Sequence, residues 1–110
     1  MRHENFITIL NECANFCNSC ADACLNEDDI SMMVSCIRND RICAEVCSSL
    51  SKILTIDVPD GEVTALVEYC KTVCERCAKE CASHEVQHCK NCAAACNKCV
   101  DACSKFLYAN

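Results

Sequence analysis

The chain has 110 residues, which fits one compact domain spanning residues 1–110, and 16 of these residues are cysteine. A net charge of −6 leaves no basic face, so the composition excludes nucleic acid and an anionic membrane surface as partners. A single glycine and a single proline exclude the turn-rich scaffolds that disulfides hold together, and they favour long helices.

The first predicted element is a helix over residues 4–25 that carries one stripe of cysteines. Steps of three and four residues return a side chain to the same face of a helix, whereas a strand would need steps of two. The stripe consists of Cys13, Cys17, Cys20 and Cys24. A polar break at residues 26–28 then separates it from the next helix.

A second helix is predicted over residues 29–54, with Asp28 and Asp29 near its N-terminus, where acidic side chains are favourable. Its cysteines are Cys36, Cys43 and Cys47. The same register places position 40 on the cysteine face, and that residue is Asp40. We therefore expect an inward carboxylate among thiols, with an ion pair to a nearby arginine or lysine as the alternative.

The third and fourth helices are predicted over residues 60–83 and 87–107. Pro59 precedes the third helix, because proline suits a helix start better than an interior. The third stripe consists of Cys70, Cys74, Cys77 and Cys81. The fourth consists of Cys89, Cys92, Cys96, Cys99 and Cys103. The connection between these helices brings His84 and His88 beside the ends of both stripes.

Short connections make successive helices antiparallel, so the predicted fold is an all-α, up-down-up-down antiparallel four-helix bundle with a cysteine-lined core. The cysteines lie late in the first and third helices and early in the second and fourth. The stripes therefore crowd toward the end that carries the first and third connections. Apolar side chains are expected to seal the opposite end: Phe6, Ile9, Leu10, Leu50, Ile53, Leu54, Val63, Leu66, Phe106 and Leu107.

Several chemistries use cysteine arrays, and the helical spacing helps to separate them. Plain core packing would not select thiols over alanine, valine or leucine at so many consecutive inward positions. Disulfides one helical turn apart have poor geometry, although disulfides between helices stay compatible with the pattern. A zinc or iron–sulfur protein is one alternative, although such sites usually take their cysteines from turns and loops. A thiol redox protein is a second alternative, because CNSC, CERC, CKNC and CNKC are CxxC motifs, here within helices.

Copper(I) fits the stripes best, because it is a soft ion that prefers thiolate and thioether ligands. Two thiolates one turn apart can hold one ion and bridge to the next, so a stripe can be filled along its length. One copper(I) per thiolate is neutral as a pair, which avoids burying bare charge. The sequence thus predicts that all sixteen cysteines are ligands to multiple copper(I) ions per chain, about 16 at one per thiolate. Met33 continues the second stripe and could add a thioether.

Two segments, CIRNDRICAEVC at residues 36–47 and CAKECASHEVQHCKNCAAACNKC at residues 77–99, resemble the cysteine-rich four-helix-bundle copper storage proteins of the cytosolic class. The resemblance covers essentially the whole chain. It implies copper(I) along the bundle axis, entry at an open end that bears histidine or methionine, and a homotetramer. It places His84 and His88 at that mouth and Asp40 as the inward carboxylate, all as auxiliary metal ligands. The three cysteines of the second helix are a departure from the family's pattern.

The N-terminal sequence has no apolar run of signal-peptide length, and no transmembrane-length stretch follows, so we expect a cytoplasmic protein without a membrane partner. The sequence shows no recognisable catalytic triad, phosphate-binding loop or acid–base pair, which argues against an enzyme. The expected function is non-enzymatic storage and sequestration of copper(I) for copper homeostasis. A copper chaperone is the expected donor or acceptor of the ions.

Overall fold

The computed structural model describes residues 1–109 and contains four α-helices and no strand within that range. The helices are α1 (Glu4–Cys24), α2 (Val34–Ile53), α3 (Thr64–Ala82) and α4 (Gln87–Tyr108). Two short 3₁₀ helices precede α2 and α3, namely η1 (Ile30–Met33) and η2 (Asp60–Glu62). The all-α fold predicted from the cysteine spacing is confirmed.

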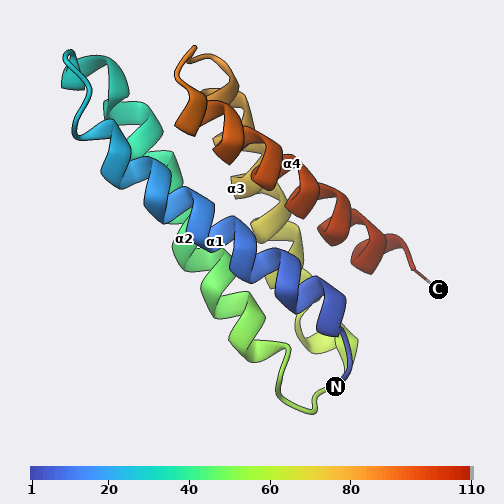
Figure 1. The fold of residues 1–110 in the computed structure, drawn as a ribbon. Coiled ribbons are helices and arrows are strands. Elements are labelled where there is room, and N and C mark those ends of the chain that lie inside the picture. The colour runs from blue at the N-terminus through green and yellow to red at the C-terminus, as the bar shows by residue number, and fades with distance from the viewer. Residues whose placement is uncertain (110) are drawn as a thin grey trace.

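The four helices form an elongated antiparallel bundle of 47 × 20 × 19 Å. Helix α1 packs against α2 and α4, and α3 packs against the same two helices. Figure 1 shows the α1–α2 and α3–α4 connections at one end, with the N-terminus and the α2–α3 connection at the other. Within residues 1–109 no helix combines the length and the hydrophobicity that a membrane span requires.

Two helix starts differ from the prediction. The second helix was expected from residue 29, but residues 30–33 form η1 and the α-helix begins at Val34. Asp29 does not cap the helix; its Oδ1 accepts a hydrogen bond from the Ser31 hydroxyl at 2.5 Å instead. The third helix likewise begins with η2 and becomes α-helical at Thr64, with Pro59 at the N-cap of η2. Backbone donors without side-chain caps are often satisfied by such tighter turns at helix ends.

The end opposite the α1–α2 and α3–α4 connections is filled by an apolar cluster, which we call the plug. Its fully or nearly buried members are Phe6, Leu10, Leu50, Leu54, Val63 and Val67. Partly buried side chains packed around them include Ile9, Ile53, Leu66, Phe106 and Leu107. Burying such a side chain contributes about 1.5–3 kcal/mol, so the plug alone supplies a stabilising core. The predicted apolar end is present, and Val67 is the member that the prediction missed.

The N-terminal residues also fasten the plug end. Nε2 of His3 lies 3.0 Å from the Asp60 carboxylate, so residue 3 is tied to the α2–α3 connection. Arg2 forms an ion pair with the same carboxylate. The His3 ring stacks at a tilt on Phe106, with 5.1 Å between the ring centroids. The N-terminal residues, the last turns of α4 and the α2–α3 connection therefore meet around the plug.

Candidate metal centre

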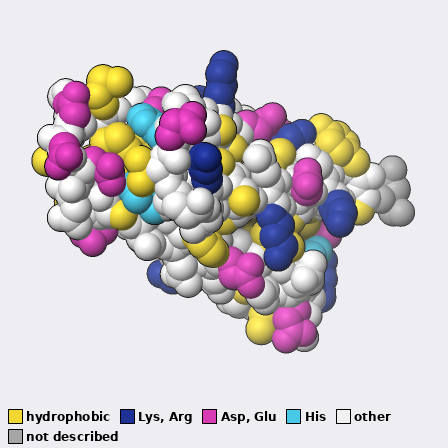
Figure 2. All heavy atoms as spheres, turned by 45° about the horizontal axis from the view of Figure 1, so that its top comes forward, with side chains coloured by type: hydrophobic (Ala, Val, Ile, Leu, Met, Phe, Trp, Pro, Cys, Tyr) yellow, Lys and Arg dark blue, Asp and Glu magenta, His cyan; other side chains and the backbone are white. Residues whose placement is uncertain are grey.

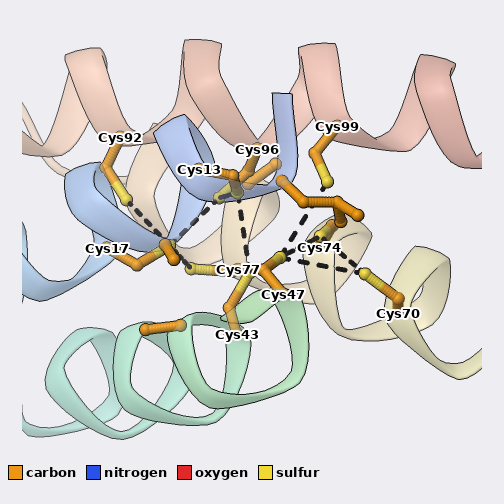
Figure 3. Packing of buried hydrophobic residues seen from close by; sticks show 14 of the residues in the cluster. Cys13, Cys17, Cys43, Cys47, Cys70, Cys74, Cys77, Cys92, Cys96 and Cys99 are labelled. Atoms are coloured by element: carbon orange, nitrogen blue, oxygen red, sulfur yellow. Dashed lines mark hydrogen bonds between the residues drawn. The ribbon is translucent and has the colours of Figure 1, made fainter. Parts of the chain in front are cut away.

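All sixteen cysteine side chains lie inside the bundle. Each is at most 1% exposed, and each is a free thiol. Figure 3 shows thiols from all four helices turned toward one another around the bundle axis. The spacing is the cause, because a side chain at every third or fourth position stays on the helix face that meets the other helices. The structure thus brings together every cysteine that the sequence analysis selected.

The section next to the plug, which we call the inner tube, is centred on Cys47 of α2. Its Sγ lies 3.6 Å from that of Cys74 and 3.8 Å from that of Cys70, both on α3. The Sγ of Cys99 on α4 lies 3.9 Å away. One thiol from each helix meets here, and these four Sγ atoms lie within 4.8 Å of one another: Cys13, Cys47, Cys74 and Cys99.

The middle of the tube is organised around Cys17 of α1. Its Sγ lies 3.6 Å from Cys96 Sγ and 3.7 Å from Cys92 Sγ on α4. It also lies 4.0 Å from Cys77 Sγ on α3. Cys96 in turn lies 3.9 Å from Cys13, which belongs to the inner tube. Neighbouring sections therefore share thiols, and the sulfur atoms form a continuous column instead of separate sites.

Asp40 faces this column, as its register predicts, and it is fully buried. Its Oδ1 accepts hydrogen bonds from the thiols of Cys77 at 3.1 Å, Cys92 at 3.3 Å and Cys81 at 3.4 Å. No lysine or arginine of residues 1–109 pairs with it, so the alternative of an ion pair is wrong. The helix register explains this, because it directs the carboxylate to the axis, where all neighbours are thiols.

The opposite end of the column, which we call the mouth, lies beneath the α1–α2 and α3–α4 connections. Four Sγ atoms lie there within 4.8 Å of one another: Cys20, Cys24, Cys36 and Cys89. Figure 2 shows histidine side chains at this end of the molecule, beside acidic and hydrophobic ones. Residues 83–86 connect α3 to α4 within four positions, so His84 in this connection and His88 just after it both lie at this end of the bundle.

His88, on the first turn of α4, contacts the thiols directly. Its Nδ1 lies 3.4 Å from Cys20 Sγ and 3.6 Å from Cys89 Sγ. Its Nε2 donates a hydrogen bond at 3.2 Å to Oε2 of Glu27, which lies in the α1–α2 connection. That bond fixes the tautomer, so the Nδ1 lone pair points at the sulfur atoms. The predicted place of His88 at the mouth therefore agrees with the geometry.

His84 is oriented differently. Its Nε2 lies 2.8 Å from Glu80 Oε2, one helical turn earlier on α3. Among residues 1–109 no thiol lies within hydrogen-bonding distance of the His84 ring. Met33, at the end of η1, is 4% exposed and belongs to the buried core cluster. The structure therefore brings one of the two selected histidines to the thiols and leaves the other at the rim.

Burial opposes the ionisation of the thiols and of Asp40 when the column is empty. Burial raises the pKa of the Cys89 thiol to about 11 and that of Cys24 further still. Burial, together with the nearby Cys92 and Cys77, raises the pKa of the Asp40 carboxyl to about 10. A low-dielectric interior disfavours charge, so only a bound cation can hold these groups ionised near neutral pH. The column can therefore take up cations in exchange for protons.

Glu27 is the one residue of the site that the sequence analysis did not select. It lies in the connection after α1, where acidic residues are common and usually solvated. Its role depends on how that connection folds back over α4. A polar residue close to the end of a cysteine stripe was the only available signal, and several residues share that position.

Comparisons with known proteins all indicate the same protein family. A family model described as copper storage protein matches residues 1–108. The uncharacterized cysteine-rich protein YhjQ of Bacillus subtilis is 39% identical over 85 residues, which is 76% of each chain. Of solved structures, a cytosolic copper storage protein from Streptomyces lividans, in a study of copper loading with five coppers, superposes with a TM-score of 0.91. It is 37% identical, and the match covers 96% of this chain and 91% of that one.

A second solved relative, the copper storage protein BsCsp3 with Cu(I) bound, is 33% identical with a TM-score of 0.89. The match covers 97% of this chain and 99% of that one. Family model, identity and fold agree over nearly the full length, and the buried thiol column is the feature that the fold serves. This chain belongs to the copper storage protein family.

Proposed function

We propose that the chain stores copper(I), holding multiple ions along its axis as a reservoir that fills and empties through the mouth. The observation that carries the proposal is the continuous column of sixteen buried thiols, in which neighbouring Sγ atoms such as those of Cys43 and Cys74 approach to 3.5 Å. Such a column offers every ion several soft ligands and every thiolate more than one ion. Two relatives that share the fold were solved with copper or Cu(I) bound.

The ligands that we propose are all sixteen cysteines together with Asp40, His84 and His88: Cys13, Cys17, Cys20, Cys24, Cys36, Cys43, Cys47, Cys70, Cys74, Cys77, Cys81, Cys89, Cys92, Cys96, Cys99 and Cys103. Each copper(I) that enters displaces a thiol proton, so the pair stays neutral and the interior is not charged. Asp40 can lose its proton in the same way when copper occupies the thiols around it. His88 can pass ions from the rim to Cys20 and Cys89, because its Nδ1 touches both thiols.

The role that we propose is sequestration of the bound ions. It is supported by the enclosure of the thiols in the bundle interior, where they also surround the buried Asp40. We propose that the protein acts in the cytoplasm as a homotetramer that exchanges copper(I) with a chaperone. The membership of the family and the cytosolic relative from Streptomyces lividans support these assignments.

An anaerobic titration of the reduced protein with copper(I) against a chromophoric chelator tests the proposal. We expect ten or more tightly held ions per chain before the chelator develops colour, because the column offers sixteen thiolates. One or two ions per chain would contradict storage. An absorption spectrum of the isolated protein separates the iron–sulfur alternative, because those clusters absorb visible light whereas copper(I) thiolates do not.

A further inference from the structure

The mouth differs in chemistry from the rest of the column. Three donor atoms form what we call the mouth triangle: Nδ1 of His88, Sγ of Cys20 and Sγ of Cys89. The two sulfurs are 3.8 Å apart, and the nitrogen lies 3.4 Å from Cys20 and 3.6 Å from Cys89. A tetrahedral zinc ion, with Zn–S of about 2.3 Å and Zn–N of about 2.0–2.1 Å, separates two sulfurs by about 3.8 Å and sulfur from nitrogen by about 3.5 Å. The triangle therefore matches three corners of a tetrahedral site.

The thiol for the fourth corner is also present. Cys36 Sγ lies 3.9 Å from Cys89 Sγ, and it belongs to the group of four mouth thiols whose Sγ atoms are all within 4.8 Å of one another. The donor atoms come from α1, α2 and α4, so an ion there would join three of the four helices. Three cysteines and one histidine are a common ligand set of structural zinc sites.

Glu27 supplies the outer shell of such a site. Histidines that bind metal ions usually donate their other ring N–H to a carboxylate, which fixes the ring and raises its basicity. Nε2 of His88 makes that bond to Glu27 Oε2 at 3.2 Å. The pair sits at the solvent boundary, with the His88 side chain 22% exposed and that of Glu27 32% exposed. No other histidine of residues 1–109 is held between a carboxylate and thiols.

The net charge that a bound ion leaves behind differs between the mouth and the inner tube. In the tube, a divalent ion among four thiolates such as Cys13, Cys47, Cys74 and Cys99 would leave two negative charges in the interior, which is costly. At the mouth, a divalent ion bound by the thiolates of Cys20, Cys36 and Cys89 and by neutral imidazole leaves one negative charge, close to the solvent boundary. A monovalent ion on the same four ligands would leave two negative charges beside Glu27. On these ligands a divalent ion therefore leaves less charge than copper(I) does, whereas the inner tube suits copper(I).

We propose that the mouth is a distinct tetrahedral site for a divalent ion of the zinc(II) type, bound by Cys20, Cys89, His88 and Cys36 and backed by Glu27. Binding displaces a proton from each thiol that becomes a thiolate, and no electron is transferred. An ion in this position would sit where the column meets solvent. The four donors are also among the ligands proposed for copper(I), so the two ions would compete at the mouth while the rest of the column is left to copper(I).

Cobalt(II) is the probe for the test, since its tetrahedral thiolate complexes absorb visible light and zinc(II) displaces it without colour. Reduced, metal-free full-length protein is titrated anaerobically with cobalt(II) and then with zinc(II). The expected result is tetrahedral bands that saturate with the first equivalent and that one equivalent of zinc(II) removes. Absence of tetrahedral bands in the wild-type protein overturns the proposal.

Three variants locate the ion. His88→Gln should weaken the first equivalent by more than about 100-fold, and Glu27→Gln should weaken it by about 10–100-fold, the usual loss for an outer-shell carboxylate. His3→Gln is the matched control, because His3 lies at the plug end beside Asp60, away from the mouth, and it should bind as the wild type does. Circular dichroism verifies that all three keep their helices. Unchanged cobalt(II) bands in His88→Gln would overturn the proposal by placing the ion elsewhere.

The same samples are titrated with copper(I), which separates this proposal from the storage function. A His88→Gln variant that loses cobalt(II) but still takes up ten or more copper(I) ions supports a divalent site distinct from the store. A variant that loses both ions in the same proportion overturns the distinction, because one shared site would then serve both. Low copper(I) capacity in wild-type protein that shows full cobalt(II) binding would contradict storage and leave the divalent site standing.

Discussion

The plug and the thiol column have different roles: the plug stabilises the fold, and the column takes up cations. In the plug, Leu10 and Leu50 are fully buried among other apolar side chains and need nothing else to be stable there. In the column, buried thiols surround Asp40, and these groups take up cations by releasing protons. A zinc finger, by contrast, has no such apolar core and unfolds without its metal. The comparison shows how a protein can be filled and emptied without losing its fold.

Truncating a side chain of the plug should lower the stability of the metal-free protein and leave its copper(I) capacity unchanged. Leu50→Ala is expected to lower the free energy of unfolding of the metal-free protein by about 2–5 kcal/mol, because it opens a cavity in a fully buried site. Urea unfolding of the reduced, metal-free chain measures the effect. The copper(I) capacity of the folded variant should equal that of the wild type.

Ile42→Ala is the matched control, because Ile42 lies on the same helix and is 44% exposed. Its free energy of unfolding should change by less than about 1 kcal/mol. A Leu50→Ala variant that keeps its stability but loses several copper(I) ions would show that the plug and the column are not separate.

The buried Asp40 carboxyl should make the stability of the metal-free protein depend on pH. Burial raises the pKa of Asp40 from 3.8 to about 10, so above pH 4 the unfolded chain ionises this carboxyl while the folded chain retains the proton. Its stabilising contribution is therefore complete below about pH 4 and falls with rising pH until about pH 10, by about 1.4 kcal/mol per pH unit. Urea unfolding at pH 5 and pH 7.5 should show a decline of about 3 kcal/mol.

Asp40→Asn removes this titration, so its decline over the same range should be smaller by that amount. Glu45→Gln, an exposed acidic position of α2, serves as the control and should behave as the wild type does. The comparison isolates Asp40, because the wild type and Asp40→Asn share every other titratable group. Equal slopes in wild type and Asp40→Asn would show that the carboxyl is not held protonated.

A substitution in the column should have the smallest effect on the metal-free protein and a specific effect on capacity. Cys103→Ser places a hydroxyl where a buried thiol stood, at a cost of about 1–3 kcal/mol. Copper(I) capacity should fall by about one ion, because thiolate ligands and ions are present in roughly equal number. Cys24→Ser at the mouth gives the matched comparison. A loss of most of the capacity in either variant would contradict a column with shared ligands.

Much of this architecture could be predicted because a helix register is a local property. The spacing of Cys70, Cys74 and Cys77 puts them on one face wherever the helix lies, and the same register placed Asp40 inside. The start of α2 was predicted too early, since η1 depends on how Asp29 and Ser31 bond each other instead of capping the helix.

The contacts between connections could not be predicted in the same way. His84 and His88 look equivalent in the sequence, but only His88 meets Glu27 and the thiols, because that contact depends on the path of the α1–α2 connection over α4. The missing signal is a long-range one, between residues 61 positions apart.

A crystal structure of the copper-loaded protein, with anomalous scattering recorded at the copper edge, tests the division between plug and column most directly. The account predicts ten or more copper positions in one line from the mouth thiols to Cys103, with no copper between Leu10 and Leu50 and with the helices in the places that they occupy here. Copper confined to one or two positions, or bound on the outer surface of the helices, would contradict it.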